Sequence, residues 1–311
     1  MIGKTEMDKY RWKGKPPNIK DIELIVPAQF ISCCPNVVGE NNAIDYAAIS
    51  QEANMSFYNQ LTSWSSQQLI RLRESPGILL VKVPEDKITD KQLKSLYYII
   101  SKGLGDLNSR YGELFEVRDR NLDYTKAAIP VSKTNATTGF HTDSTALEYS
   151  PDIVGLLCLQ PAEIGGESIV TNAADLYLWM KRGYPEFVKV LKEPIIRDII
   201  TPGSETNLKA IKKNRFPVFS FDSYTFKFRY MRYWIISGHK RCQIKISPPL
   251  MNALDKIEEF FQKKENLLFY KMERGDMLFI NNNFICHNRT KYEDQEEKGI
   301  KRTLLRTWIN F

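Results

Sequence analysis

Two of the three histidines in this 311-residue chain lie where they could share a metal ion. His141 precedes Asp143 by two positions, and His287 ends a short apolar run much later in the chain. In an extended segment, residues i and i+2 point to one face about 6.6 Å apart, so His141 and Asp143 can converge on one ion. Two imidazoles and one carboxylate leave three octahedral positions open, which suits iron(II) that must bind a bidentate cosubstrate and dioxygen.

The pattern His-x-Asp with a distant histidine leaves other interpretations open. Polar residues at the ends of two strands would give the same letters without any metal. The three side chains could also hold zinc, with water in the fourth position, as in a hydrolase. The third histidine, His239, lies in the sequence Ser-Gly-His-Lys, where we expect an exposed turn rather than a ligand.

A segment near the C-terminus carries two arginines that would share one face of a strand. Alternation over residues 302–309 places Arg302 and Arg306 on the same side. A guanidinium that reaches into an interior is suited to bind a carboxylate through its planar fork. The α-carbons of the two arginines would be about 13 Å apart, so we expect them to bind different groups. Two surface arginines on an edge strand are the alternative.

A glycine pair marks a turn that would deliver a hydroxyl group onto the strand that follows it. The turn reads Gly165-Gly166-Glu167-Ser168, and its side chain of interest is the serine.

Taken in chain order, these motifs resemble the taurine dioxygenase and clavaminate synthase group of iron(II)- and 2-oxoglutarate-dependent oxygenases. The motifs are His-Thr-Asp, Gly-Gly-Glu-Ser, His-Asn-Arg-Thr and Arg-Thr-Leu-Leu-Arg, and the similarity covers about residues 75–311. Taurine dioxygenase-like enzymes carry a Thr or Ser 27 residues after the first iron-binding histidine, and Ser168 holds that position here (168 − 141 = 27). The loop between His287 and Arg302 is longer than in taurine dioxygenase and is similar to that of clavaminate synthase.

The resemblance implies a role for each of these side chains. His141, Asp143 and His287 would bind iron(II), and Arg302 with Ser168 would bind the far carboxylate of 2-oxoglutarate. Arg306 would face the substrate, unless it pairs with an acidic side chain such as that of Glu148.

The implied activity is that of an oxidoreductase that uses iron(II), 2-oxoglutarate and dioxygen and releases succinate and carbon dioxide. The expected substrate is a small anionic molecule such as an amino acid or a derivative, free or linked to a carrier, and hydroxylation is the default outcome. A nucleic-acid demethylase of the same superfamily is an alternative that the net charge of +7 would suit, but the Gly-Gly-Glu-Ser turn argues against nucleic acid as a partner. A binding protein that merely keeps the fold is another.

The pattern of apolar and turn residues around these positions predicts a mainly β protein with helices (α+β). Short apolar runs between turn residues dominate from about residue 127, as in a β-sandwich or barrel. The resemblance implies a double-stranded β-helix core (jelly roll, cupin-like) with N-terminal and inserted helices. Expected strands are 78–83, 153–159, 168–171, 218–221, 224–236, 242–246, 277–280, 284–287 and 303–309, and expected helices are 64–74, 89–103, 173–182 and 249–264.

Composition and charge place these elements in a single globular domain. The chain is 42% hydrophobic and 26% charged, which provides ample material for one core. We expect a mobile basic arm over residues 1–20, one jelly-roll oxygenase domain over residues 21–311, and an inserted loop at about 203–216. Five cysteines without CxxC spacing, and no apolar stretch long enough for a leader or a membrane span, predict a cytoplasmic protein without membrane contact.

Overall fold

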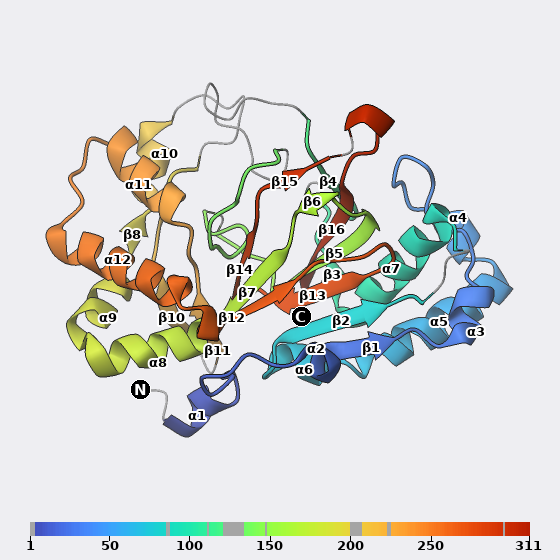
Figure 1. Cartoon of the computed structure of the whole chain (residues 1–311), viewed down its shortest axis with the longest axis horizontal. Helices are drawn as coiled ribbons and strands as arrows, with labels where there is room; N and C mark the ends of the chain where they lie inside the picture. The colour runs from blue at the N-terminus through green and yellow to red at the C-terminus, as the bar shows by residue number, and fades with distance from the viewer. Residues whose placement is uncertain are drawn as a thin grey trace.

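Two β-sheets pack at the centre of the molecule, with helices on both sides of them (Figure 1). The structure is a computed structural model that describes residues 4–84, 88–110, 112–120, 134–146, 148–199, 207–222, 225–294 and 296–311. The larger sheet has the order β1-β2-β13-β5-β16-β3, with β4 also beside β16, and the smaller has the order β12-β7-β14. Their strands are β1 (Glu23–Ile25), β2 (Ile78–Lys82), β3 (Asp106–Leu107), β4 (Phe115–Arg118), β5 (Ile153–Gln160), β7 (Ser168–Asn172), β12 (Leu267–Tyr270), β13 (Met277–Asn281), β14 (Ile285–Arg289) and β16 (Thr303–Asn310).

Alternation of side chains along the central strands fills two hydrophobic clusters, one on each face of the larger sheet. On β5, Val154 and Cys158 belong to the cluster that the smaller sheet joins through Val170 and Ile285. Leu157 of the same strand points into the second cluster instead. Successive side chains of a strand point to opposite faces. The continuously apolar run in the sequence is therefore a strand that is buried on both sides.

Helix α7 (Asp90–Leu104) packs with α5 (Glu52–Ser66) on the outer face of the larger sheet. Thr89 begins α7 as an N-cap, because its side chain accepts a hydrogen bond from the backbone N–H of Gln92. The Tyr97 hydroxyl lies 2.8 Å from Oγ1 of Thr307 on β16. A Cβ at Gly155 of β5 would lie 2.8 Å from that hydroxyl, so a glycine leaves the space that Tyr97 occupies.

Helices α8 (Ala173–Gly183), α9 (Pro185–Leu191) and α12 (Pro248–Gln262) pack against one another on the other side of the core. Asn172 is the last residue of β7 and also the N-cap of α8, since its side chain accepts hydrogen bonds from the backbone N–H groups of Ala174 and Asp175.

A smaller unit lies beyond these helices. It contains β8 (Ile195–Ile196), α10 (Leu208–Lys213), β9 (Arg215–Phe216) and α11 (Arg232–Arg241), and its own hydrophobic cluster consists of Ile196, Ile211 and Cys242.

The expected fold class is confirmed, since a sheet-rich core with N-terminal and inserted helices is present. In the part of the chain that the structure describes, the sheets do not close into a barrel. The helix expected over residues 64–74 is two helices, with α5 ending at Ser66 and α6 spanning Leu69–Arg73.

The strands expected over residues 224–236 and 242–246 are wrong except for β11 (Thr225–Phe228). Helix α11 begins at Arg232 because helical spacing buries one face made of Ile235, Gly238 and His239. Gly238 is required there, since a Cβ would lie 2.6 Å from the backbone nitrogen of Asp198.

Residues 4–20 are not the free arm that the basic sequence predicted. Met7, Tyr10 and Trp12 are buried in the same cluster as the inner face of the larger sheet. The Trp12 indole donates a hydrogen bond to the Pro76 carbonyl oxygen at 2.8 Å, and Arg11 pairs with Asp175 of α8 at 2.9 Å. The segment is therefore part of the domain, while residues 1–3 lie outside the described residues.

The insert expected at about 203–216 contains helix α10 rather than an open loop. Asn207 caps this helix, and the side chain of Ile211, on its inner face, is fully buried. Residues 203–206 lie outside the described residues.

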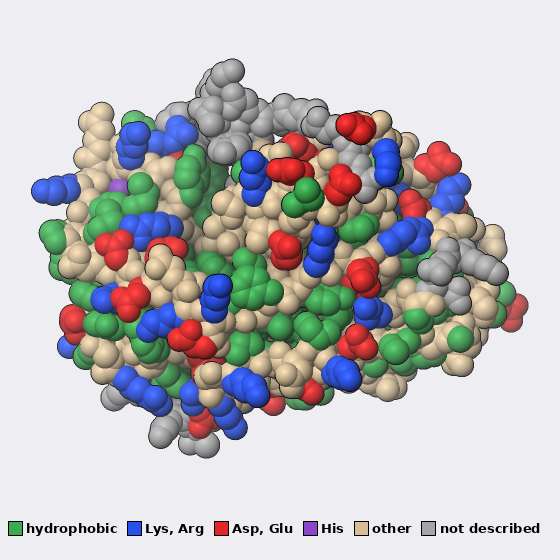
Figure 2. Space-filling model, in the orientation of Figure 1, with side chains coloured by type: hydrophobic (Ala, Val, Ile, Leu, Met, Phe, Trp, Pro, Cys, Tyr) green, Lys and Arg blue, Asp and Glu red, His purple; other side chains and the backbone are tan. Residues whose placement is uncertain are grey.

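The remaining elements complete the chain without altering this arrangement. No helix in the described part of the chain is long and apolar enough to cross a membrane. On the face drawn in Figure 2, cationic and anionic side chains are interspersed over much of the surface. The remaining helices and strands of the chain are α1 (Lys4–Asp8), α2 (Ile19–Ile22), α3 (Ala28–Ser32), α4 (Tyr46–Ile49), β6 (Ile164–Gly165), β10 (Phe219–Asp222), β15 (Tyr292–Glu293) and the 3-10 helices Lys264–Asn266 and Glu296–Lys298.

Candidate metal centre

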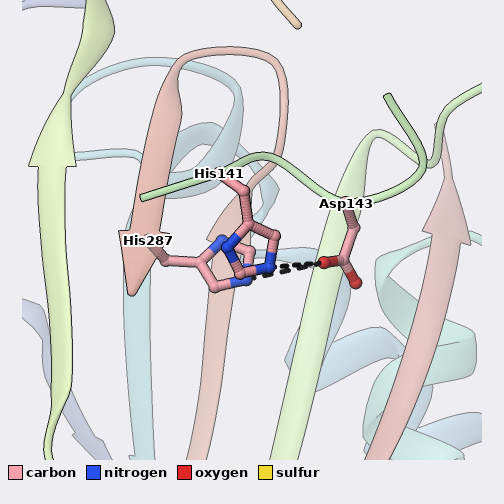
Figure 3. Close-up of side chains that lie close together, drawn as sticks. All are labelled: His141, Asp143 and His287. Carbon is pink, nitrogen blue, oxygen red and sulfur yellow. Dashed lines mark ion pairs between the residues drawn. The ribbon is translucent and has the colours of Figure 1, made fainter. Parts of the chain in front are cut away.

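The two histidines of the predicted metal site are paired through their backbones. The backbone N–H of His141 donates to the carbonyl oxygen of His287, and that of His287 donates back, each at 2.9 Å. This antiparallel bridge places the two imidazole rings side by side, with centroids 4.2 Å apart (Figure 3). His287 comes from β14 of the smaller sheet, so a strand of that sheet fixes one ring and, through the bridge, the other.

Asp143 reaches the same point from the turn that follows His141. Its Oδ1 lies 3.4 Å from Nε2 of His141 and 3.5 Å from Nε2 of His287. The turn is held by Asn282, whose side chain accepts from the backbone N–H of Asp143 at 2.7 Å and donates to its carbonyl oxygen at 3.2 Å. In Figure 3 the three side chains point toward one another.

These three residues form a cluster whose ligand atoms all lie within 4.8 Å of one another. Nδ1 of His141 lies 2.9 Å from the carbonyl oxygen of Gly139. A carbonyl oxygen only accepts, so Nδ1 carries the proton and Nε2 keeps its lone pair for a metal. Two imidazole nitrogens and one carboxylate oxygen are a donor set that fits iron(II).

The second carboxylate oxygen of Asp143 is already engaged. The indole N–H of Trp308 donates to Oδ2 at 2.7 Å, and Nη1 of Arg306 lies 3.3 Å from the same atom. Oδ1 alone is therefore directed at the histidines, which favours a carboxylate that binds a metal through one oxygen.

Charge and burial set the protonation states of the cluster. Burial opposes ionisation of Asp143, but the charge of Arg306 and the neighbouring side chains of His141 and His287 outweigh it and hold its pKa well below the usual range. Burial and the neighbouring His141 lower the pKa of His287. An ionised carboxylate beside a neutral imidazole is the state in which both groups can bind a metal.

Arg302 is a buried cation with an unused donor. It is 5% exposed, and its Nη1 has no hydrogen-bond partner among the described residues. Its guanidinium lies over the ring of Tyr292, 5.0 Å from the centroid, and burial lowers its pKa. A buried guanidinium N–H without a partner is costly, so this position is suited to an anionic ligand.

The glycine turn lies against this arginine. A Cβ at Gly166 would lie 3.2 Å from Nε of Arg302, so the glycine permits the close approach. Ser168 begins β7 two residues later and is buried.

Arg306 lies at the metal cluster. Its guanidinium stacks over the rings of Phe115 and Trp308, at 4.9 and 4.4 Å from their centroids. Arg306 does pair with an acidic side chain, as the alternative stated, but its partner is Asp143 and not Glu148.

Three features of the site and its surroundings differ from the sequence interpretation or were missed by it. His239 is buried in α11, with Nδ1 2.9 Å from the Ile235 carbonyl oxygen, so the expected exposed turn is wrong. Trp308 was missed as a partner of Asp143, although it follows Arg306 by two positions and so lies on the same face of the strand. Asn282 was also missed, and no sequence signal indicates its contact with Asp143.

Comparison with known proteins finds similar sequences and similar folds among oxygenases. Residues 43–308 match the model of the family described as Taurine catabolism dioxygenase TauD, TfdA family. FR-33289 synthase of Streptomyces rubellomurinus (strain ATCC 31215) is 25% identical over 79% of this chain and 72% of its own length. Gamma-butyrobetaine dioxygenase of Homo sapiens is 22% identical over 59% of this chain, which spans only 46% of that relative.

Two solved structures share the fold over nearly the whole chain. An asparagine oxygenase in complex with Fe(II), 2S,3S-3-hydroxyasparagine and succinate superposes with a TM-score of 0.69, at 14% identity over 93% of each chain. The non-haem iron oxygenase OrfP in complex with Fe and alpha-ketoglutaric acid gives a TM-score of 0.62, at 13% identity over 93% of this chain and 94% of its own. At such identity the likeness establishes the fold.

Proposed function

The chain belongs to the taurine catabolism dioxygenase (TauD, TfdA) family, and on this premise we propose that it is an iron(II)- and 2-oxoglutarate-dependent dioxygenase with His141, Asp143 and His287 as its metal ligands. The observation that carries the ligand assignment is the convergence of three ligand atoms within 4.8 Å of one another. The engagement of Oδ2 of Asp143 by Trp308 supports it, because it leaves one carboxylate oxygen for the metal.

The protein's own residues hold and orient the reactants. When bound, iron(II) with 2-oxoglutarate and dioxygen supplies the oxidising chemistry that yields succinate, carbon dioxide and an oxidised substrate. Arg302 binds the far carboxylate of 2-oxoglutarate, with Ser168 as a further donor. The unused Nη1 of Arg302 and its burial support this role. Burial of both residues also keeps water away from the cosubstrate.

Arg306 binds an anionic group of the substrate beside the metal. It contacts Asp143 through one nitrogen, and a guanidinium carries five N–H donors, so further donors remain for a ligand. An amino acid or an amino-acid derivative is the substrate class that we favour, with hydroxylation as the outcome. The names of relatives support it, because they include gamma-butyrobetaine dioxygenase, and the solved structures include complexes with hydroxylated asparagine and arginine.

The substrate is a small molecule, either free or held on a carrier, and not a nucleic acid. We also place the protein in the cytoplasm, which the odd number of cysteines without CxxC spacing supports.

A screen for succinate release tests the proposed activity. The protein would be incubated with iron(II), 2-oxoglutarate, dioxygen and single amino acids, first free and then as carrier-linked thioesters. We expect one substrate class to raise succinate release well above the substrate-free rate. Stimulation by methylated oligonucleotides alone would instead favour a nucleic-acid demethylase.

A further inference from the structure

The positive charge of the chain is concentrated in the unit that contains α10 and α11. Residues 195–247, which include this unit, hold 11 Lys and Arg residues and three Asp and Glu residues, a net charge of +8. The rest of the chain has 44 − 11 = 33 Lys and Arg residues against 37 − 3 = 34 Asp and Glu, and so is close to neutral. The net charge of +7 therefore comes from this one part of the molecule.

Many of these cations form an exposed face, which we call the basic face. Lys209, Lys212 and Lys213 lie on α10, and Lys240 and Lys245 lie at and beyond the end of α11. All five are exposed, and none has an acidic partner among the described residues. Two arginines nearby are paired and do not belong to the face, since Arg232 contacts Asp255 and Arg241 contacts Asp198, each at 2.7 Å.

Apolar side chains lie among these lysines. Leu208 is 45% exposed, Tyr233 is 54% exposed and Ile244 is 36% exposed. Figure 2 shows cationic and hydrophobic side chains intermixed on the surface over α10 and α11. Apolar anchors within a charged rim are typical of a protein–protein interface. A surface for the phosphate backbone of nucleic acid depends mainly on cationic and polar contacts.

The unit is joined directly to the metal cluster. Met231, the N-cap of α11, pairs with His141 through an isolated bridge. Arg197 of the unit donates to the carbonyl oxygen of Arg229, whose own guanidinium donates to the carbonyl oxygen of Thr145 at 3.2 Å. Helix α11 has ten residues and is about 15 Å long, so the lysines at its far end lie about one helix length from the metal ligands.

We propose that the basic face docks a small acidic carrier protein that presents the substrate to the metal centre on a flexible arm. An arm longer than about 15 Å would span α11. The charge of the face matches an acidic partner, and such complementarity speeds association and fixes orientation. The inference rests on the proposed function, because it names how the substrate of that site arrives.

The test compares one amino acid presented in two ways. The probes are the amino-acyl thioester of free pantetheine and the same thioester on an acidic carrier domain. The variant is K209Q/K212Q/K213Q, which removes three charges from exposed positions of α10 and leaves the buried Ile211 in place. We expect kcat/KM for the carrier-bound probe to fall about tenfold and its salt dependence to weaken, with no change for the pantetheine probe.

A matched control removes three charges elsewhere. Lys181, Lys189 and Lys264 are exposed and lie outside the basic face, so K181Q/K189Q/K264Q should leave both probes unchanged. Equal kcat/KM for the two probes in the unmodified protein would overturn the proposal, as would equal losses in the two triple variants. Loss of double-stranded oligonucleotide binding in the α10 variant, without any effect on the carrier-bound probe, would assign the face to nucleic acid.

The proposed function would be judged separately in the same samples. The visible band of the anaerobic complex with iron(II) and 2-oxoglutarate requires neither probe. If the band forms and the carrier advantage is absent, docking alone is wrong. If the band does not form, the dioxygenase assignment itself fails.

Discussion

At the scale of single residues, the two carboxylate oxygens of Asp143 have different partners. Oδ1 faces the two histidines, and Oδ2 accepts from the indole of Trp308. Residues that orient a ligand commonly change metal affinity when they are replaced. Trp308 is therefore a positioning residue in this account.

Trp308→Phe should weaken metal binding while the ring continues to fill its space. The variant loses the 2.7 Å hydrogen bond to Asp143, and we expect a tenfold to hundredfold lower affinity, roughly the range for such partners. Anaerobic titration of the metal-free protein with cobalt(II), followed by its visible spectrum, measures this. Trp12→Phe is the matched control, since that indole donates to the Pro76 carbonyl away from the cluster. Equal affinity in the two variants would contradict the role given to Trp308.

Arg302→Lys should weaken 2-oxoglutarate binding, because lysine keeps the charge and loses the planar fork. A charge-assisted hydrogen bond contributes about 1.5–3 kcal/mol, so we expect the dissociation constant to rise by roughly ten- to a hundredfold. Titration of the iron(II) protein with 2-oxoglutarate under nitrogen gives this constant. An unchanged value would move the cosubstrate assignment to Arg306.

Protonation of His287 should make the metal-free protein less stable in mild acid. Its pKa is lowered in the folded state by burial and by His141, from a usual value of 6.5. The unfolded chain therefore binds a proton more readily, and this residue's contribution to the free energy of unfolding falls as pH decreases through about 6.5. Urea unfolding at pH 7.5 and 5.5 measures the difference, which should shrink in His287→Gln. An equal pH dependence in the variant would show that other groups cause it.

At the scale of elements, the N-terminal segment is a structural part of the domain. Trp12 is 9% exposed and packs in the main hydrophobic cluster. Trp12→Ala should lower the free energy of unfolding by about 3 kcal/mol, since truncation of a buried tryptophan leaves a cavity. Lys15→Ala, at an exposed position of the same segment, should change it little. Chemical unfolding of both variants tests this, and a free arm would give no loss in either.

The elements that sequence predicted well are those whose pattern admits one interpretation. The apolar runs of β5 and β13 are short, and α7 has both a capping residue and a clear helical period. The first half of helix α11 was taken as part of a strand, because its aromatic and β-branched residues, such as Trp234 and Ile235, also fit a strand. Gly238 of this helix packs closely against the backbone of Asp198, and this long-range contact leaves no local pattern in the sequence.

Part of the candidate site could also be identified from local sequence signals. His141, Asp143, His287 and Arg302 are marked by residue type and by motif order. Asn282 acts through backbone contacts with a residue 139 positions away in sequence, which no spacing rule indicates.

At the scale of the whole molecule, the larger sheet contributes one of its faces to each of the two hydrophobic clusters. Both hydrophobic clusters contain residues of β2, β5, β13 and β16. We therefore predict that the domain, its N-terminal segment included, unfolds as one cooperative unit. Coincident transitions by near-ultraviolet and far-ultraviolet circular dichroism would support this. A separate early loss of helical signal would show that the α10–α11 unit unfolds by itself.

The central claim is that His141, Asp143 and His287 hold an iron that chelates 2-oxoglutarate. Its most direct test is the visible absorption of the protein with iron(II) and 2-oxoglutarate under nitrogen. The account predicts a charge-transfer band that His141→Ala, Asp143→Ala and His287→Ala each abolish and that His239→Ala retains. No band in the unmodified protein, or a band that persists in any of the three ligand variants, would contradict it.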